Sequence, residues 1–362
     1  MVFIAATVLL MMVIAWASTG PSTSALVKPK TPHPKQATQA AHTTGSILLE
    51  WVGDITPGSR YGIPPGNGRG QLNRVSAYLR NADLTLGNLE GTLSNGGPDK
   101  CGSSGGSNCF SFRAPTSGVD GLKSAGFDLL NLANNHAWDF GQEGQSQTTH
   151  ALQKAGIRYS GKPGQITILR HGKFKVAAVG FAPYAWAANI NAPGSAARLV
   201  QKATHMADLV VVMIHAGAEG SDKGHVPYGS EYAFGENRGD SRAFAHKMIR
   251  VGADLVVGSG PHVVRGMEWY HGHLIAYSAG NFAGWHNFGL GGNLSESALL
   301  RVRLDASGKM LRGQWRSVWI QQPGYPVLDQ SNRSGNHANE LGLADFGKSA
   351  VRVGPDGQLI TP

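Results

Sequence analysis

The sequence has few cysteines, no internal repeat, and no run of basic residues interleaved with aromatic ones. The lack of a repeat excludes solenoid architectures. The lack of a basic and aromatic cluster argues against nucleic acid as a partner, although the 362-residue chain carries a formal net charge of +9. A basic surface also suits anionic polymers or acidic membrane surfaces, and solubility alone is the simpler explanation.

The apolar N-terminal run, Val2 to Ala17, is shorter than the roughly 20 residues that a comfortable membrane span needs. Ala15-Trp16-Ala17 has the small-x-small pattern of a signal-peptidase site, but no basic n-region precedes it. The run contains no cysteine, which excludes lipid attachment there. We predict a signal peptide or membrane anchor at residues 1–17 and an exported protein, secreted or tethered to the outer face of the cell membrane.

Residues 18–44 are rich in Pro, Thr, Ala, Ser and Lys. Such a composition buries too little apolar surface to fold, so we predict a disordered linker. The two cysteines, Cys101 and Cys109, lie in a loop rich in Gly, Ser and Asn. Free or metal-binding thiols would fit a cytosolic protein, whereas an oxidising compartment would let the pair close a small loop. Because the N-terminus indicates export, we predict a disulfide.

Short apolar segments alternate with segments of helical spacing, and hairpins follow late in the chain. Strands are expected at residues 46–52, 82–88, 127–130, 208–214 and 253–257. Helices are expected at residues 71–81, 116–126, 141–155, 195–206 and most of 232–251. Hairpins are expected at 166–181 and 262–278, and antiparallel strands at 297–304 and 313–320. This order predicts an α/β protein with a mixed sheet or two stacked sheets and outer helices.

Polar side chains follow most of the expected strands. They are Asp54, Glu90, Asn135 with His136, His215 with Glu219, and His262. Open α/β sheets bind ligands at the carboxyl ends of their strands, although any one of these residues alone would also suit a turn. Carboxylate, amide and imidazole donors favour Mn, Fe or Zn over Ca. A carboxylate that bridges two ions fits a two-metal hydrolase, in which His136 would protonate a leaving oxygen.

These residues belong to six ordered motifs. The motifs are Gly53-Asp54, Asn88-Leu89-Glu90, Asn134-Asn135-His136 with Asp139-x-Gly141, His215-x-Gly217-x-Glu219, Gly258-x-x-Pro261-His262 and Gly280-Asn281-Phe282. The set resembles the CapA/PgsA family of capsule and poly-γ-glutamate synthesis proteins, which is similar to calcineurin-like metallophosphatases. The resemblance covers about Ile47 to Leu304. It implies a four-layer α/β/β/α sandwich with mixed β-sheets in residues 45–320, followed by a C-terminal tail at 321–362.

The resemblance also implies a metal site for one or two divalent ions (Mn, Fe or Zn). It places five residues at ligand positions: Asp54, Glu90, Asn135, His215 and His262. It places His136 at the general-acid position. Other residues expected to line the site are Asn134, Asp139, Glu219, Ser259 and Asn281.

The sequence departs from metallophosphatases at three ligand positions. Thr56 stands where a histidine commonly follows the first aspartate, Glu90 replaces a bridging aspartate, and Ser259 or Gly260 stands where the last motif has its first histidine. Fewer ligands indicate a weaker or mononuclear site.

Three hypotheses about function follow. The first is an exported protein of capsule or poly-γ-glutamate synthesis, which as an enzyme would be a metal-dependent hydrolase of phosphate esters or of an anionic cell-envelope polymer. The second is a non-catalytic or transpeptidase-like accessory that binds the polymer and works with membrane synthase subunits. The third is a plain binding module with vestigial site residues. We expect an anionic envelope polymer as partner and no nucleic acid.

Overall fold

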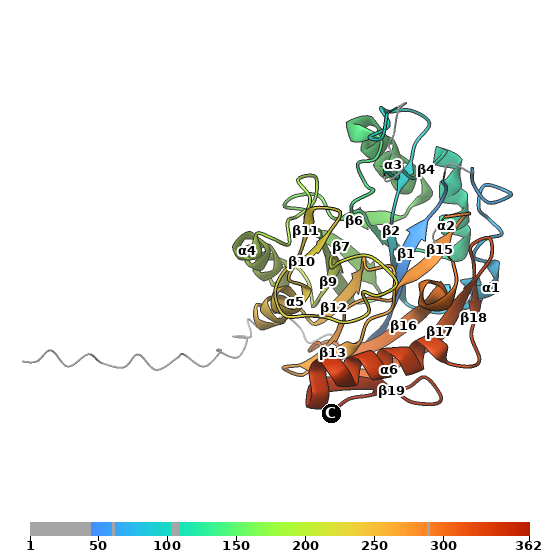
Figure 1. Ribbon diagram of the computed structural model, residues 1–362. Coiled ribbons are helices and arrows are strands. Elements are labelled where there is room, and N and C mark those ends of the chain that lie inside the picture. The colour runs from blue at the N-terminus through green and yellow to red at the C-terminus, as the bar shows by residue number, and fades with distance from the viewer. Residues whose placement is uncertain (1–44, 60–61, 103–108, 288–289) are drawn as a thin grey trace, which may run out of the picture. The chain divides into compact units, whose positions relative to one another are not determined.

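Two eight-stranded mixed sheets form the centre of the protein (Figure 1). The structure is a computed structural model and describes residues 45–59, 62–102, 109–287 and 290–362. The predicted anchor or signal peptide at 1–17 and the linker at 18–44 lie outside the described residues. Within the described ranges, no helix is long and apolar enough to cross a membrane.

The first sheet combines strands from the N-terminal and C-terminal parts of the chain. Its strands are β1 (Ser46–Thr56), β2 (Leu84–Leu89), β5 (Leu129–Asn131), β6 (Arg158–Ser160), β15 (Asn281–Gly284), β16 (Glu296–Asp305), β17 (Met310–Gln321) and β18 (Tyr325–Leu328). Their order is β18-β17-β16-β1-β2-β5-β6, and β15 also pairs with β1. Strands β1, β2, β5 and β6 run parallel, so their carboxyl ends lie at one edge.

The second sheet is built around parallel, largely apolar strands. It consists of β7 (Thr167–His171), β8 (Phe174–Phe181), β9 (Leu209–His215), β12 (Leu255–Ser259), β13 (Met267–Tyr270), β14 (His273–Ala276), β19 (Ala350–Val353) and β20 (Leu359–Ile360). Their order is β20-β19-β13-β14-β12-β9-β8-β7. Strands β9 and β12 are buried along their whole length, as expected for continuous apolar runs covered on both faces.

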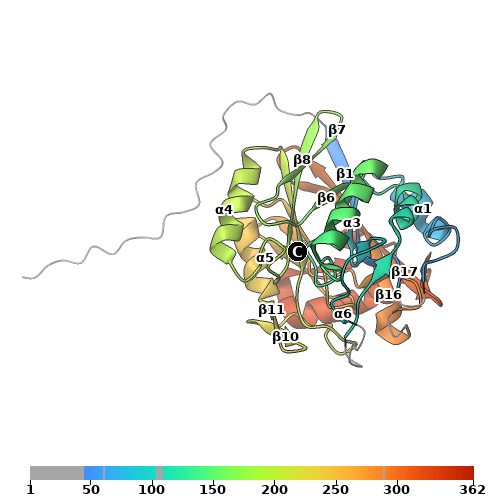
Figure 2. The ribbon, with the colours of Figure 1, turned by 90° about the horizontal axis from the view of Figure 1, so that it is seen from above.

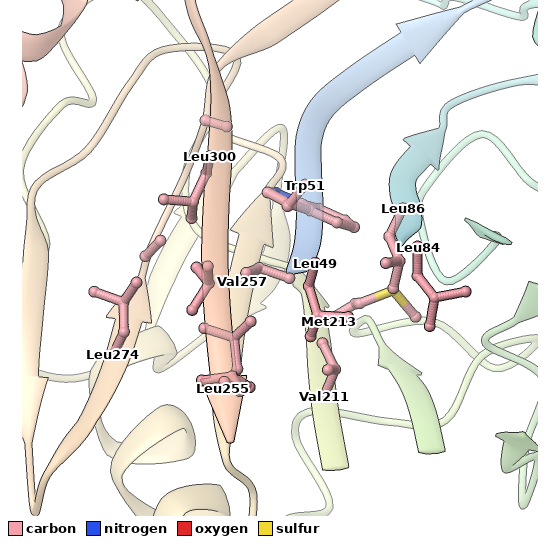
Figure 3. Packing of buried hydrophobic residues seen from close by; sticks show 14 of the residues in the cluster. Leu49, Trp51, Leu84, Leu86, Val211, Met213, Leu255, Val257, Leu274 and Leu300 are labelled. Carbon is pink, nitrogen blue, oxygen red and sulfur yellow. The ribbon is translucent and has the colours of Figure 1, made fainter. Parts of the chain in front are cut away.

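The two sheets pack face to face through one apolar core (Figure 3). Leu49 and Trp51 of β1 meet Val211 and Met213 of β9 there, and Trp51 Nε1 donates a hydrogen bond to the Gly258 carbonyl at 3.2 Å. Each fully buried side chain of this kind stabilises the fold by about 1.5–3 kcal/mol. This core fixes one sheet against the other and so aligns the strand ends that carry the candidate site.

Helices cover the outer face of each sheet (Figure 2). The first sheet packs against α1 (Asn73–Leu79), α2 (Val119–Ala125) and α3 (Gly141–Ala155), through residues such as Leu79, Leu122 and Leu152. The second packs against α4 (Pro193–Thr204) and α5 (Ser241–Arg250), through residues such as Val200 and Met248. The four-layer α/β/β/α sandwich with mixed sheets is therefore confirmed.

Two regions differ from the sequence-based expectation. The segment after Gln321, where no element was expected, forms β18, α6 (Arg333–Phe346), β19 and β20, and α6 contacts strands of both sheets. The first part of 232–251, where Gly235 and Gly239 indicated a loop before the helix, is a hairpin of β10 (Glu231–Ala233) and β11 (Glu236–Gly239). Gly235 and Gly239 adopt φ of 79° and 87°, which ends any helix there, and α5 begins only after the Asp240 cap.

The predicted disulfide between Cys101 and Cys109 is present. It closes part of the loop between β3 (Thr92–Leu93) and β4 (Arg113–Ala114), two short strands that pair in parallel. Lys100, next to this bridge, reaches Asp139 in the candidate site. The disulfide loop is thus anchored beside the strand ends.

Candidate metal centre

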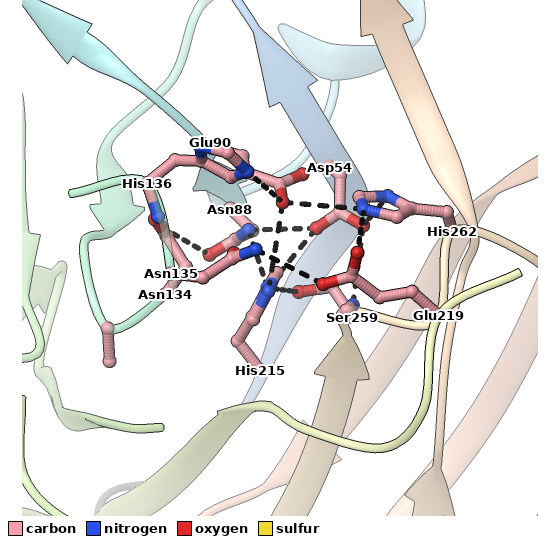
Figure 4. A network of polar contacts seen from close by, with 12 residues as sticks. Asp54, Asn88, Glu90, Asn134, Asn135, His136, His215, Glu219, Ser259 and His262 are labelled. Carbon is pink, nitrogen blue, oxygen red and sulfur yellow. Dashed lines mark hydrogen bonds and ion pairs between the residues drawn. The ribbon is translucent and has the colours of Figure 1, made fainter. Parts of the chain in front are cut away.

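The carboxyl ends of strands from both sheets meet at one place, and the predicted site residues gather there (Figure 4). The first sheet supplies Asp54 on β1, Glu90 after β2, and Asn134, Asn135, His136 and Asp139 after β5. The second sheet supplies His215 on β9, Glu219 after it, Ser259 on β12 and His262 after that strand. Packing of the sheets thus brings together residues that are more than 200 positions apart in the sequence. Gly260 N lies 3.3 Å from Asp54 Oδ2, although the two residues are 206 positions apart.

The tightest group of potential ligands is formed by Asp54, Glu90 and His262. Their ligand atoms all lie within 4.8 Å of one another, and they are the one such group of three His, Cys, Asp or Glu among the described residues. His262 Nδ1 is 3.3 Å from Asp54 Oδ2, and His262 Nε2 is 3.5 Å from Glu90 Oε1. His215 adjoins this group, with Nδ1 3.6 Å from Asp54 Oδ1 and Nε2 3.7 Å from Glu90 Oε1.

Unpartnered oxygen atoms show that the group suits a cation. Both carboxylate oxygens of Glu90 and the Oδ1 atom of Asn135 are buried and have no hydrogen-bond partner. Burial, with repulsion from Asp54 and Glu219, raises the pKa of Glu90 well above its usual range. A buried carboxylate without a partner is costly, and a bound divalent ion would satisfy these oxygens. The donor set therefore fits Mn, Fe or Zn.

His262 is held in an uncommon backbone conformation. Its φ of 64° lies in the left-handed region, which few residues with a side chain adopt. Its Nδ1 lies 2.8 Å from Asn281 Oδ1, an acceptor that turns Nε2 toward Glu90. Burial opposes a charged ring, but Glu90, Asp54 and Glu219 raise the pKa of His262 to about 10. An ion that binds Nε2 would replace this proton.

Asp54 is kept ionised by the same histidines. Burial opposes its charge, yet contacts with His215 and His262 hold the pKa of Asp54 below its usual range. Asn88 Nδ2 also donates to Asp54 Oδ1 at 2.8 Å and lies 3.2 Å from His215 Nδ1. The sequence analysis identified Asn88 only as the first residue of a motif. In the structure, its side chain contacts both Asp54 and His215.

His136 faces the group from the opposite side. Its Nδ1 donates to Asp139 Oδ2 at 2.7 Å, and its Nε2 lies 4.0 Å from Glu90 Oε1. Lys100 Nζ contacts the other Asp139 oxygen at 2.6 Å. Burial lowers the pKa of His136 despite the nearby Asp139. A carboxylate thus orients the ring so that Nε2 is the nitrogen available to a reacting group.

Two of the expected site-lining residues connect the site to its scaffold. Asn134 Nδ2 donates to the Leu89 carbonyl at 2.9 Å, and Asn134 Oδ1 accepts from His136 N at 3.1 Å. Asn134 therefore fixes the loop between β5 and α3 rather than facing the ion position. Ser259 Oγ lies 3.2 Å from His215 Nδ1 and so contacts a predicted ligand.

Two of the positions that depart from metallophosphatases, Thr56 and Gly260, carry no histidine. Thr56 is buried, and its hydroxyl has no hydrogen-bond partner. Gly260 has φ of 114°, and a Cβ there would lie 2.9 Å from Ala216 N. A histidine at position 260 would therefore strain this backbone, whereas glycine lets its N–H approach Asp54.

Arg238 was missed by the sequence analysis. It lies on β11, and its side chain is 1% exposed. Its Nη1 is 2.6 Å from Glu219 Oε1, and its Nη2 is 3.5 Å from His215 Nε2. Within a segment expected to be mostly helical, nothing in the sequence distinguishes this arginine from a surface charge.

The chain matches the family described as bacterial capsule synthesis protein PGA_cap over residues 48–284. It belongs to this family. It is 30% identical over 294 residues to the capsule biosynthesis protein CapA of Bacillus anthracis, covering 72% of this chain and 65% of the relative. It is 31% identical over 207 residues to the PGA biosynthesis protein CapA of Bacillus subtilis (strain 168), covering 52% of this chain and 50% of the relative. The match thus spans half to two thirds of these relatives' lengths.

Among solved structures, the chain is similar to a 5'-nucleotidase precursor from Thermus thermophilus. The TM-score is 0.40 at 14% identity, covering 78% of this chain and 54% of the other. A likeness at this level supports no conclusion about substrate or chemistry. The family assignment rests on the sequence match, and the fold rests on the layers described above.

Proposed function

We propose that this chain acts outside the cytoplasm in the synthesis of an anionic capsular polymer such as poly-γ-glutamate, and that it does so through a divalent-metal site. Membership of the capsule synthesis family supports the biological role. The net charge of +9 suits contact with a polyanion, and the disulfide suits an oxidising compartment. The observation that carries the metal site is the buried Glu90 carboxylate beside Asp54 and His262, whose two oxygens lack hydrogen-bond partners.

Asp54, Glu90 and His262 would hold the ion, and Asn135 Oδ1 is an unpartnered oxygen beside them. A divalent ion would supply Lewis-acid chemistry for hydrolysis of an ester or amide linkage.

The chain's own residues position a proton. Asp139 accepts the Nδ1 proton of His136, which leaves Nε2 as the atom that exchanges a proton with substrate. This arrangement agrees with a general-acid role for His136. Asn281 orients His262 by accepting from its Nδ1, so Asn281 and Asp139 act through their histidines and are positioning residues.

A second candidate is a non-catalytic accessory that binds polymer beside membrane synthase subunits. The absence of ligands at Thr56 and Gly260 favours it, because a sparse site binds metal more weakly. In both candidate functions the protein binds the polymer. Only in the first does the metal site hydrolyse a substrate.

The test compares the full-length chain with Asp54→Asn and His262→Asn. Asparagine suits position 262 because it tolerates the positive φ of His262. His271→Asn is the matched control, since His271 also has positive φ (51°) but lies in an exposed turn. Bound metal is measured together with metal-dependent hydrolysis of bis(p-nitrophenyl) phosphate and of purified poly-γ-glutamate.

We expect wild type and His271→Asn to bind metal and hydrolyse one of these substrates, and both site variants to lose metal and activity. Metal-independent turnover that survives both substitutions would contradict the hydrolase. Polymer binding without turnover would support the accessory role instead.

A further inference from the structure

Arg238 is a fixed positive charge inside the candidate metal centre. Its guanidinium is buried, and it contacts Glu219 and His215, two predicted site residues that lie outside the compact group of Asp54, Glu90 and His262. Glu219 Oε1 accepts from Arg238 Nη1 at 2.6 Å and from Asn135 Nδ2 at 3.1 Å. A second carboxylate, Glu236, lies 3.5 Å from Nη1 but is half-exposed.

The guanidinium also faces His215. Arg238 Nη2 lies 3.5 Å from His215 Nε2, and an arginine donates and never accepts. His215 Nδ1 lies 3.2 Å from Asn88 Nδ2, 3.2 Å from Ser259 Oγ and 3.6 Å from Asp54 Oδ1. With a fixed cation at Nε2 and these polar groups around Nδ1, His215 is poorly placed to bind a second ion.

Charge balance leads to the same conclusion. Asp54 and Glu90 are fully buried and Glu219 is 13% exposed, so three poorly solvated carboxylates share the site. One divalent ion and one guanidinium neutralise three carboxylates, whereas two divalent ions beside the guanidinium would leave an excess of positive charge with little solvent. A fixed guanidinium also costs no reorganisation when charge develops in a reaction.

We propose that Arg238 takes the place of a second cation and that the centre binds a single divalent ion, held on the side of Asp54, Glu90 and His262. This inference rests on the proposed metal site. Arg238 excludes a second ion in two ways. Its positive charge repels the ion, and its guanidinium contacts Glu219 and His215, which would otherwise serve as ligands of that ion.

The experiment counts Mn²⁺ ions bound per full-length chain by equilibrium dialysis with elemental analysis, and records the Mn²⁺ electron paramagnetic resonance spectrum. Wild type is compared with Arg238→Lys, which keeps the charge, and Arg238→Met, which removes it. Arg301→Met is the matched control, because Arg301 is another largely buried arginine and pairs with Glu50, away from the site.

We expect one ion and an uncoupled spectrum for wild type, Arg238→Lys and Arg301→Met. We expect a second ion and a spin-coupled spectrum for Arg238→Met, because Glu219 and His215 Nε2 become available. Two coupled ions in wild type would overturn the inference even if Arg238→Met fails to fold. A single ion in folded Arg238→Met would overturn it too, whereas no ion in any variant would overturn the proposed metal site itself.

Discussion

Replacing Glu90 by glutamine tests whether this carboxylate exists to bind metal. In the absence of metal, Glu90 is a fully buried carboxylate with two unpartnered oxygens, and burial raises its pKa well above its usual range. An acid whose folded pKa is raised stabilises the protein below its unfolded pKa and loses that contribution as pH rises. The loss is about 1.36 kcal/mol for each pH unit between the two values. In a chelator, Glu90→Gln should therefore be at least as stable as wild type and gain on it as pH rises.

Metal should stabilise wild type but not Glu90→Gln. At a free Mn²⁺ concentration of about 100 times Kd, binding stabilises wild type by about 2.7 kcal/mol. The folded unit has about 320 residues, so its unfolding entropy is about 0.67 kcal/mol per kelvin and the expected rise in Tm is about 4 °C. Glu90→Gln should show almost no rise, because a neutral amide cannot replace the carboxylate.

The assay is differential scanning calorimetry of the full-length chain in chelator and in Mn²⁺, at pH 6 and pH 8. Glu50→Gln is the control, because Glu50 is also a buried glutamate of the first sheet but pairs with Arg301. It should keep the full metal-dependent rise. An equal rise in wild type and Glu90→Gln would refute the reasoning, as would a loss of several kcal/mol by Glu90→Gln in chelator.

Three further predictions concern the positioning residues and a remote carboxylate. Asn281→Ala should weaken Mn²⁺ binding about 10–100-fold in a calorimetric titration, because His262 loses the acceptor that orients it. Asp139→Asn should lower kcat about 10²–10⁴-fold with unchanged Mn²⁺ affinity, since only the orientation and proton of His136 change; equal kcat values would exclude that role. Burial, against the pull of Arg301, raises the pKa of Glu50 from 4.5 to about 7, so its stabilisation is full below pH 4.5 and lost as pH rises through 7. Urea unfolding at pH 5 and pH 8 should show wild type losing about 2.5 kcal/mol relative to Glu50→Gln, and parallel curves would contradict this.

The elements that were predicted correctly from the sequence are those that bury large apolar side chains. Strands β9 and β12 begin as apolar runs of Val, Leu, Ile and Met before their polar ends at His215 and Ser259, and the turn at His271-Gly272 joins two further strands, β13 and β14. The strand-end motifs then placed Asp54, Glu90 and His262 at one edge. Helix α6 escaped prediction because it buries Ser334, Gly335, Ala338 and Gly342, small residues that leave little apolar periodicity.

Arg238 escaped for a different reason. A charged residue is buried only when a partner close in space compensates it, and the partner of Arg238 is Glu219, which lies on a separate loop. The hairpin that carries Arg238 is set by glycines whose positive φ values end the expected helix. Local patterns therefore identify strand-end carboxylates and histidines, but not the cation that the tertiary fold adds to them.

The most direct test of the metal centre is anomalous diffraction from crystals of the protein grown with Mn²⁺. We predict one anomalous peak within coordination distance of Asp54, Glu90 and His262, the three residues whose ligand atoms lie within 4.8 Å of one another. No peak at this position at saturating Mn²⁺, with Glu90 buried and still unpartnered, would contradict the claim that these strand ends form a metal site.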